Sequence, residues 1–158
     1  MSPLSPTARK IQEYLHANGF DLTVVEFPDS TRTAQEAADR VGCEIGQIVK
    51  SLVFRGRSSS RPVLVLTSGA NRVKEKRISA HLGEKIERAD AEFVRETTGF
   101  AIGGVPPVGH AQPLTTYLDE DLMGYQTIWA AAGTPNAVFE LTPSELLSLS
   151  GAQVVGVK

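Results

Sequence analysis

The sequence predicts a mixed α/β (α+β) fold, in which a largely antiparallel, barrel-like sheet of about seven strands is surrounded by about five helices. Helical and extended patterns alternate along the 158 residues, but not in the repeating strand–helix order of a parallel sheet. Two extended runs joined by a short polar turn predict a β-hairpin. With 41% hydrophobic residues, the chain can bury one compact core, so we expect a single domain over residues 1–158.

Helix caps and apolar runs predict the elements of the N-terminal half. Ser5 followed by Pro6 opens a first helix that stops at Gly19. The segment 33–36, Thr-Ala-Gln-Glu, has the pattern of a capping box and opens a second helix, which Gly42 closes. The remaining elements expected in this half are strands at 22–27, 48–54 and 62–67 and a basic helix at 71–82.

The C-terminal half is predicted in the same way. A short strand near Ile86 precedes a helix capped by Asp90. After a loop rich in glycine and proline, a second capping box at 142–145, Thr-Pro-Ser-Glu, opens a short helix. The strands expected after the loop are 115–118, 127–131, 137–141 and 153–157.

Composition narrows the class of protein. Cys43 is the only cysteine, which excludes an internal disulfide and a cysteine-based zinc cluster. The three histidines are far apart, and the phosphate-binding and dinucleotide-binding glycine patterns are missing, so we expect no metal and no cofactor. The sequence lacks both the apolar stretch of a signal peptide and an apolar run of membrane-spanning length, so we expect a cytoplasmic protein with no membrane partner.

The segment 99–110, Gly-Phe-Ala-Ile-Gly-Gly-Val-Pro-Pro-Val-Gly-His, predicts a shaped loop. Gly103 and Gly104 allow a ligand to approach backbone N–H groups closely, and Pro106 and Pro107 stiffen the path that follows. The alternative is a tight connection between two elements. His110 ends the loop, where it is either a catalytic group or the cap of a turn.

Lys50 interrupts an apolar strand. Period-two alternation places it on one face with Ile48, Leu52 and Phe54. Sequestering an ammonium group costs free energy, which indicates a function for the charge. The alternative is a lysine that buries its stem and keeps its charged end in water.

Basic residues cluster between positions 55 and 77, although the whole chain has a net charge of −2. A single acid, Glu75, lies among them. The cluster indicates a local positive surface that suits a phosphate backbone, and a solvated helix face with a hairpin turn is the alternative. Its members are Arg55, Arg57, Arg61, Arg72, Lys74, Lys76 and Arg77.

Three ordered segments, 46–54, 103–110 and 132–141, resemble the YbaK/ProX family of aminoacyl-tRNA deacylases. Members of this family, which include an editing domain inserted in bacterial prolyl-tRNA synthetases, hydrolyse amino acids wrongly esterified to tRNA. The resemblance implies a barrel-like mixed sheet with helices. It also implies that the family lysine is Lys50 and that the Gly-x-x-x-Pro motif lies on Gly103 and Pro107.

From the resemblance we expect a trans-editing deacylase that acts on tRNA-Pro, or a related tRNA, carrying a small amino acid such as Ala, Cys or Ser. The candidate catalytic groups are Lys50 and the N–H groups of Gly103 and Gly104, with water as the attacking nucleophile. The candidate substrate-binding residues are Phe27, Ser30, Thr31, Pro107, His110, Gly133, Thr134 and Asn136, and the candidate tRNA-binding residues are Arg72, Lys74, Lys76 and Arg77. Some relatives carry histidine in the segment matching 133–136, which leaves the amino acid open.

The expected partner is the acceptor end of an aminoacyl-tRNA, bound alone or together with an aminoacyl-tRNA synthetase. Two alternatives remain. The first is a non-catalytic accessory protein that binds a tRNA end or a nucleotide, and the second is hydrolysis of an ester other than aminoacyl-tRNA. Steep salt dependence would indicate binding through the basic residues.

Overall fold

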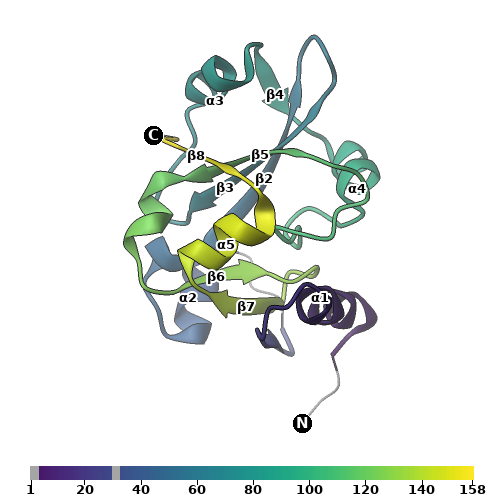
Figure 1. The fold of residues 1–158 in the computed structure, drawn as a ribbon, viewed down its shortest axis with the longest axis vertical. Coiled ribbons are helices and arrows are strands. Elements are labelled where there is room, and N and C mark those ends of the chain that lie inside the picture. The colour runs from purple at the N-terminus through teal and green to yellow at the C-terminus, as the bar shows by residue number, and fades with distance from the viewer. Residues whose placement is uncertain (1–3, 30–32) are drawn as a thin grey trace.

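A computed structural model describes residues 4–29 and 33–158 (Figure 1). The mixed α/β class is confirmed, but the single barrel-like sheet is not. The described strands form one sheet of five strands and another of three. The two sheets are linked only by an isolated bridge between Ile48 and Trp129 among these residues, so no closed barrel forms. The order of the elements along the sequence did not reveal this split.

The larger sheet has the strand order β4-β2-β3-β5-β8. β2 and β3 form the predicted antiparallel hairpin, and β4 is antiparallel to β2. β5 runs parallel to β3, and β8 runs parallel to β5. The bounds are β2 Val49–Gly56, β3 Pro62–Ser68, β4 Ile86–Arg88, β5 Thr115–Asp119 and β8 Gln153–Val155.

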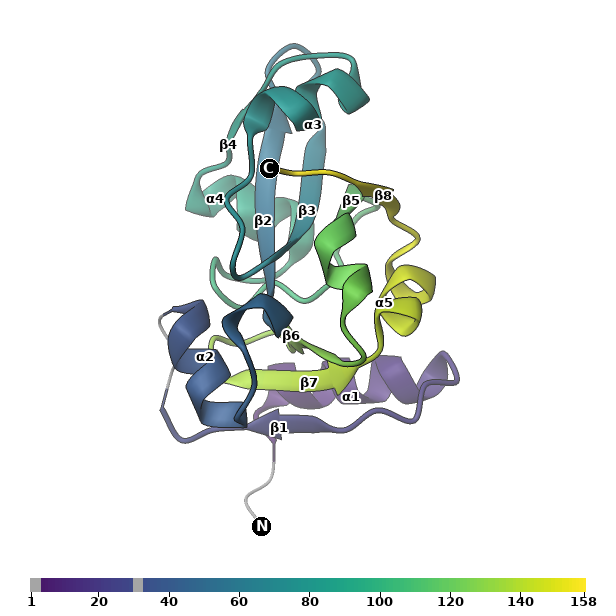
Figure 2. The same cartoon turned by 90° about the vertical axis from the view of Figure 1, so that its left-hand side faces the viewer.

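The smaller sheet is antiparallel, with the order β1-β7-β6. Its strands are β1 Val24–Glu26, β6 Ile128–Ala131 and β7 Ala137–Leu141. In Figure 2, β2 and β3 run along the long axis of the molecule, whereas β1 and β7 run across it. The two sheets therefore diverge from the end of β2 that carries the bridge.

Five α-helices lie around the sheets in the described chain. They are α1 Pro6–Ala17, α2 Ala34–Val41, α3 Glu75–Leu82, α4 Ala91–Thr98 and α5 Pro143–Ser150, with short 3-10 helices η1 Ile45–Gln47 and η2 Glu120–Gly124. The Thr142 capping box is confirmed, with Thr142 and Glu145 each accepting the other's N–H. The basic helix begins at Glu75 rather than at Asn71, because the Asn71 side chain is held by two aspartates of the β5–η2 segment.

The core lies on both faces of β3. Leu64 and Leu66 belong to the cluster shared with α1, α5 and the smaller sheet, whereas Val63 and Val65 pack in a second cluster with Ile78 of α3. β3 is therefore buried on both faces, and it pairs with β2 from Val49 to Arg55. Within the described residues, no helix is both long and apolar enough to cross a bilayer.

Candidate active site

The strand that carries Lys50 has a neighbour along one edge only. β3 pairs with β2 from Val49 to Arg55, whereas β4 pairs only with Phe54–Gly56 on the other edge. At the start of the strand, Ile48 forms the bridge to β6. In the part of the chain that the structure describes, the segment 49–53 therefore has no partner strand on this second edge. This leaves a gap beside the edge of the strand at 49–53.

A cleft occupies this gap. It consists of two adjoining hollows of about 390 and 310 Å³. Arg72 and Arg88 line the first, whereas the second lies against α2 and β6 and is mostly apolar. The residues that line both hollows are Lys50, Ser51, Leu52, Ile102, Gly103 and Val105.

Lys50 is only half-buried, and its ammonium group is oriented by one backbone carbonyl. Its Nζ donates to the Asn71 oxygen at 3.2 Å. An ammonium has three donors, and no other acceptor for Nζ lies among the described residues. The remaining two donors are available to a ligand in the cleft.

The glycine loop, residues 99–110, contributes Gly103 to the cleft that Lys50 lines. Gly103 has a φ of +92°, in the left-handed region that favours glycine. The N–H groups of Gly103 and Val105 have no acceptor within the described chain, whereas Gly104 N–H donates to Ala101 O at 3.1 Å. The sequence predicted that the Gly104 N–H group donates to substrate, but in the structure this group donates within its own loop. A Cβ on Gly104 would lie 2.8 Å from Thr134 Cα, so this glycine permits two loops to pack closely.

Three residues that line the cleft were missed by sequence reasoning. Ser51 has a buried hydroxyl with no hydrogen-bond partner in the described structure, although a serine in an apolar strand is itself a signal. Ile102 is 57% exposed at the cleft, an unusual position for a large apolar side chain. Arg88 reaches the cleft through the β2–β4 pairing, which no local pattern reveals.

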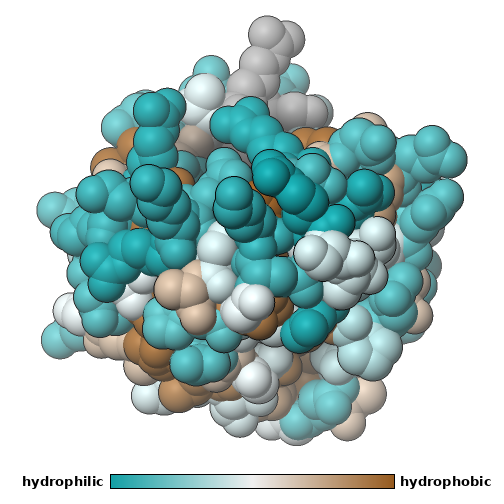
Figure 3. All heavy atoms as spheres, turned by 90° about the horizontal axis from the view of Figure 1, so that it is seen from above, coloured by the Kyte–Doolittle hydropathy of each residue, from teal (hydrophilic) through white to brown (hydrophobic). Residues whose placement is uncertain are grey.

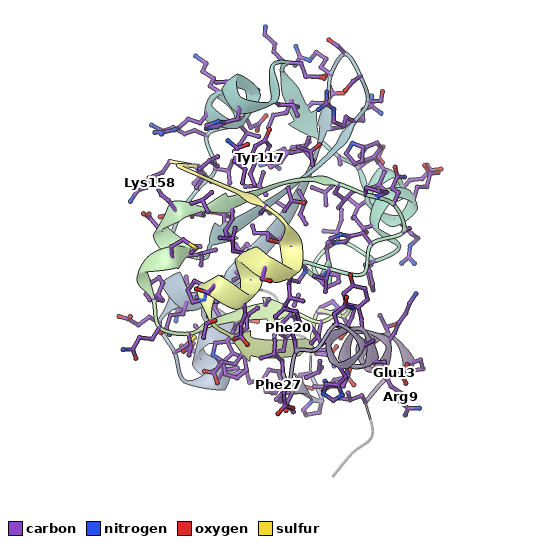
Figure 4. The ribbon with its side chains drawn as sticks, viewed as in Figure 1. Arg9, Glu13, Phe20, Phe27, Tyr117 and Lys158 are labelled. Atoms are coloured by element: carbon purple, nitrogen blue, oxygen red, sulfur yellow. The ribbon has the colours of Figure 1, made fainter. Side chains whose placement is uncertain are left out.

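Thr134 is the one predicted substrate-binding residue that lines the cleft among those described. Asn136 and Phe27 instead join two segments: Asn136 Nδ2 donates to Phe27 O at 2.6 Å, and Phe27 N donates to Asn136 O at 2.8 Å. Phe27 lies at the end of the molecule that carries Phe20 and α1 (Figure 4). Gly133 packs against Thr7 and Phe100. The predictions for Ser30 and Thr31 lie outside the described residues.

Pro107 and His110 line a separate surface hollow with Tyr14. His110 Nε2 donates to the Pro106 carbonyl at 2.7 Å, which corresponds to the turn-capping alternative. Burial lowers the pKa of His110, and the hydrogen bond to Pro106 opposes this effect only in part. The ring is therefore neutral near pH 7 and lies outside the cleft.

The basic residues divide into two groups. Arg72 lines the cleft, and Lys74, Lys76 and Arg77 are exposed at α3. Hydrophilic residues cover much of this end of the molecule (Figure 3). The arginines of the β2–β3 hairpin, in contrast, pair with glutamates: Arg55 and Arg57 with Glu87, and Arg61 with Glu84. The local excess of positive charge is therefore concentrated at Arg72 and the start of α3.

Within the described residues, no group of three or more His, Cys, Asp or Glu side chains is arranged to hold a metal ion. The polar groups that line the cleft are one ammonium group, two guanidinium groups, backbone N–H donors, the hydroxyls of Thr33, Ser51 and Thr134, and the carboxylate of Glu75. The cations and donors of this set stabilise developing negative charge on a substrate.

Comparison with known proteins gives consistent findings. Residues 28–149 match the aminoacyl-tRNA editing domain family. The crystal structure of a candidate trans-editing enzyme for prolyl tRNA synthetase superposes with a TM-score of 0.93, at 57% identity over 99% of each chain. A candidate Cys-tRNA(Pro)/Cys-tRNA(Cys) deacylase of Enterococcus faecalis, EbsC, is 32% identical over 122 residues, 77% of this chain and 74% of EbsC.

Some relatives are much longer proteins, of which only one part matches this chain. The proline–tRNA ligase of Limosilactobacillus fermentum is 33% identical over 96 residues, which make up 58% of this chain and 17% of the ligase.

Proposed function

The chain belongs to the aminoacyl-tRNA editing domain family, and we propose that it is a trans-editing deacylase that hydrolyses the ester of a mischarged tRNA. The proposed substrate is tRNA-Pro, or a related tRNA, carrying a small amino acid such as Ala, Cys or Ser. One observation carries the proposal: Lys50 lines the same cleft as Gly103, whose N–H group has no acceptor among the described residues.

The proposed reaction is attack of water on the aminoacyl carbonyl carbon. The carbonyl oxygen becomes negatively charged as the new C–O bond forms, and the N–H groups of Gly103 and Val105 stabilise this charge. The bond to the ribose oxygen then breaks, and that oxygen receives the proton lost by the water. We assign the proton transfer to a neighbouring ribose hydroxyl, although the carboxylate of Glu75 also lines the larger hollow.

The two hollows suit the two ends of the substrate. Arg72, Arg88 and Lys50 provide positive charge for the terminal phosphate and ribose in the larger hollow. Four alanines, Ala34, Ala37, Ala130 and Ala131, form part of the lining of the second hollow, and such small residues suit a short aminoacyl side chain. A pocket of this kind distinguishes one methylene by about 1–3 kcal/mol.

Single-turnover release of labelled amino acid from correctly charged and mischarged tRNAs tests the proposal. The wild type is compared with Lys50→Ala and with Lys10→Ala, which removes an exposed lysine of α1 away from the cleft. We expect rapid release from one mischarged species, loss of this release in Lys50→Ala and a normal rate in Lys10→Ala.

Three results would overturn parts of this proposal. Binding of tRNA without release of any amino acid would favour the non-catalytic accessory protein. Release that is equally fast from a small aminoacyl ester, with no salt dependence, would point to an ester other than aminoacyl-tRNA. A full rate in Lys50→Ala would remove Lys50 from the mechanism.

A further inference from the structure

A buried carboxylate contacts Asn71, the residue whose carbonyl accepts from Lys50 Nζ. Asp119, at the end of β5, is 1% exposed. Its Oδ2 accepts from Thr67 Oγ1 at 3.0 Å, from Ser68 N at 3.0 Å and from Asn71 Nδ2 at 2.8 Å, and its Oδ1 accepts from Asp121 N at 2.9 Å. All four contacts are donations to the carboxylate, so its burial is compensated.

Asn71 is held by this carboxylate and by two further acceptors. Its Nδ2 donates to Asp121 Oδ2 at 2.8 Å as well as to Asp119, and its backbone N–H donates to Ser68 O at 3.0 Å. Asp121 is in turn paired with Lys158 Nζ at 3.0 Å, and Lys158 lies at the side of the molecule that carries η2 (Figure 4). The Asn71 amide is therefore held by two carboxylates in one orientation.

The backbone carbonyl of Asn71 is the acceptor that holds Lys50 Nζ. Because the rest of Asn71 is fixed, the position of this carbonyl is fixed too. The ammonium group is thereby held at the cleft by a carbonyl that belongs to a rigid turn, with two of its donors left for substrate.

We propose that Asp119 and Asn71 are positioning residues for Lys50: the buried Asp119 carboxylate clamps the Asn71 amide so that the Asn71 carbonyl directs the Lys50 ammonium into the cleft. Neither residue lines the cleft. This inference rests on the proposed function for its effect on rate, but the geometry it claims is independent of any activity. Displacement of a catalytic group by about 1 Å can cost about 10²-fold in rate.

The test is Asn71→Ala, which removes the clamped amide but keeps the carbonyl. The matched control is Asn18→Ala, which removes an amide that donates to Tyr14 O at the end of α1. Two quantities are measured in protein shown to be folded by circular dichroism: the single-turnover deacylation rate, and the NMR signals of the Lys50 ε-methylene, assigned by their loss in Lys50→Ala.

In the wild type we expect two distinct ε-proton shifts for Lys50, because the ammonium group is tethered. In Asn71→Ala we expect them to merge at the value of a solvated lysine, with a rate lower by about 10-fold to 10²-fold. Asn18→Ala should match the wild type in both. If Asn71→Ala does not fold, Asp119→Asn, which keeps the shape of the side chain, should produce the same changes to a smaller degree.

The two readouts separate this inference from the proposed function. Merged Lys50 signals in Asn71→Ala, with no deacylation by the wild type, would support the clamp and overturn the deacylase. Unchanged Lys50 signals would overturn the clamp, whether or not the rate falls, because a loss of rate would then arise from a neighbour such as Arg72.

Discussion

Gly104→Ala should damage the active cleft through backbone packing alone. Gly104 lies where the glycine loop meets the 133–136 loop, and an added Cβ would lie 2.8 Å from Thr134 Cα, 2.9 Å from Gly133 O and 3.0 Å from Gly133 C. The φ of Gly104 lies outside the left-handed region, so alanine adopts this backbone without torsional strain. The cost is therefore purely steric.

The magnitude follows from these distances. Carbon atoms pack best at about 3.5–4.0 Å, so the Cβ at 2.8 Å from Thr134 Cα is too close by about 0.7–1.2 Å. All three neighbours are backbone atoms, which cannot turn aside, and the two loops must separate. Overpacking of this kind costs about 1–3 kcal/mol in unfolding free energy. Moving the adjacent N–H groups of Gly103 and Val105 by about 1 Å should lower the rate by about 10²-fold.

Urea unfolding and single-turnover deacylation of Gly104→Ala measure the two effects. Gly124→Ala is the matched control, since Gly124 also lies outside the left-handed region and a Cβ there meets nothing within 4 Å. We expect the control to stay within about 0.5 kcal/mol of the wild type with an unchanged rate. Wild-type stability and rate in Gly104→Ala would refute the close packing of the loops, and lost stability with a full rate would show that these N–H groups do not act on the substrate.

Three further predictions concern single side chains. Ser51→Ala should slow deacylation while leaving the urea midpoint equal or higher, because the buried hydroxyl lines the cleft, has no partner within the described protein and gains one when substrate binds; an unchanged rate would remove Ser51 from the site. His110 has a lowered pKa when folded, so its contribution to stability is full above the ordinary histidine pKa of about 6.5 and is lost as the pH falls through the folded value. His110→Gln should therefore lose less stability than the wild type between about pH 7.5 and about pH 5 in urea unfolding, and equal losses would contradict the burial effect. Thr142→Ala should lower unfolding free energy by about 1 kcal/mol in thermal melts, because the Glu145 N–H loses its acceptor, and an unchanged melting temperature would show that the cap is not stabilising.

Local patterns predicted most elements, and pairing over long distances decided the rest. Caps at Ser5, Thr33 and Thr142 are encoded within a few residues, and the structure places helices at all three. The division into two sheets depends on which edge of β2 meets β4 and β6, residues far apart in sequence. For this reason the barrel-like sheet was not confirmed, although each strand was expected.

The candidate site shows the same division. Lys50 and Gly103 are recognisable from local chemistry and lie together in the cleft. Asn136 has the same polar character as a ligand-binding residue, but its amide is used by Phe27, which is over 100 positions away. A polar residue's partner is set by the tertiary fold, so its sequence context alone could not tell a binding role from a structural one.

The vacant strand position beside β2 has a consequence for how this protein can change. Along 49–53 the edge of β2 that faces away from β3 has no partner strand in the described chain, and substitution alters side chains but cannot remove a peptide N–H or C=O other than through proline. Contacts that a ligand makes with this main-chain edge are therefore insensitive to most substitutions, unlike contacts with the side chains of Lys50, Arg72 and Arg88. The walls on α2 and β6 are side chains on separately stabilised elements, such as Ala37 and Ala131. The shape of the cleft can accordingly change at these walls while the main-chain groups of the β2 edge persist.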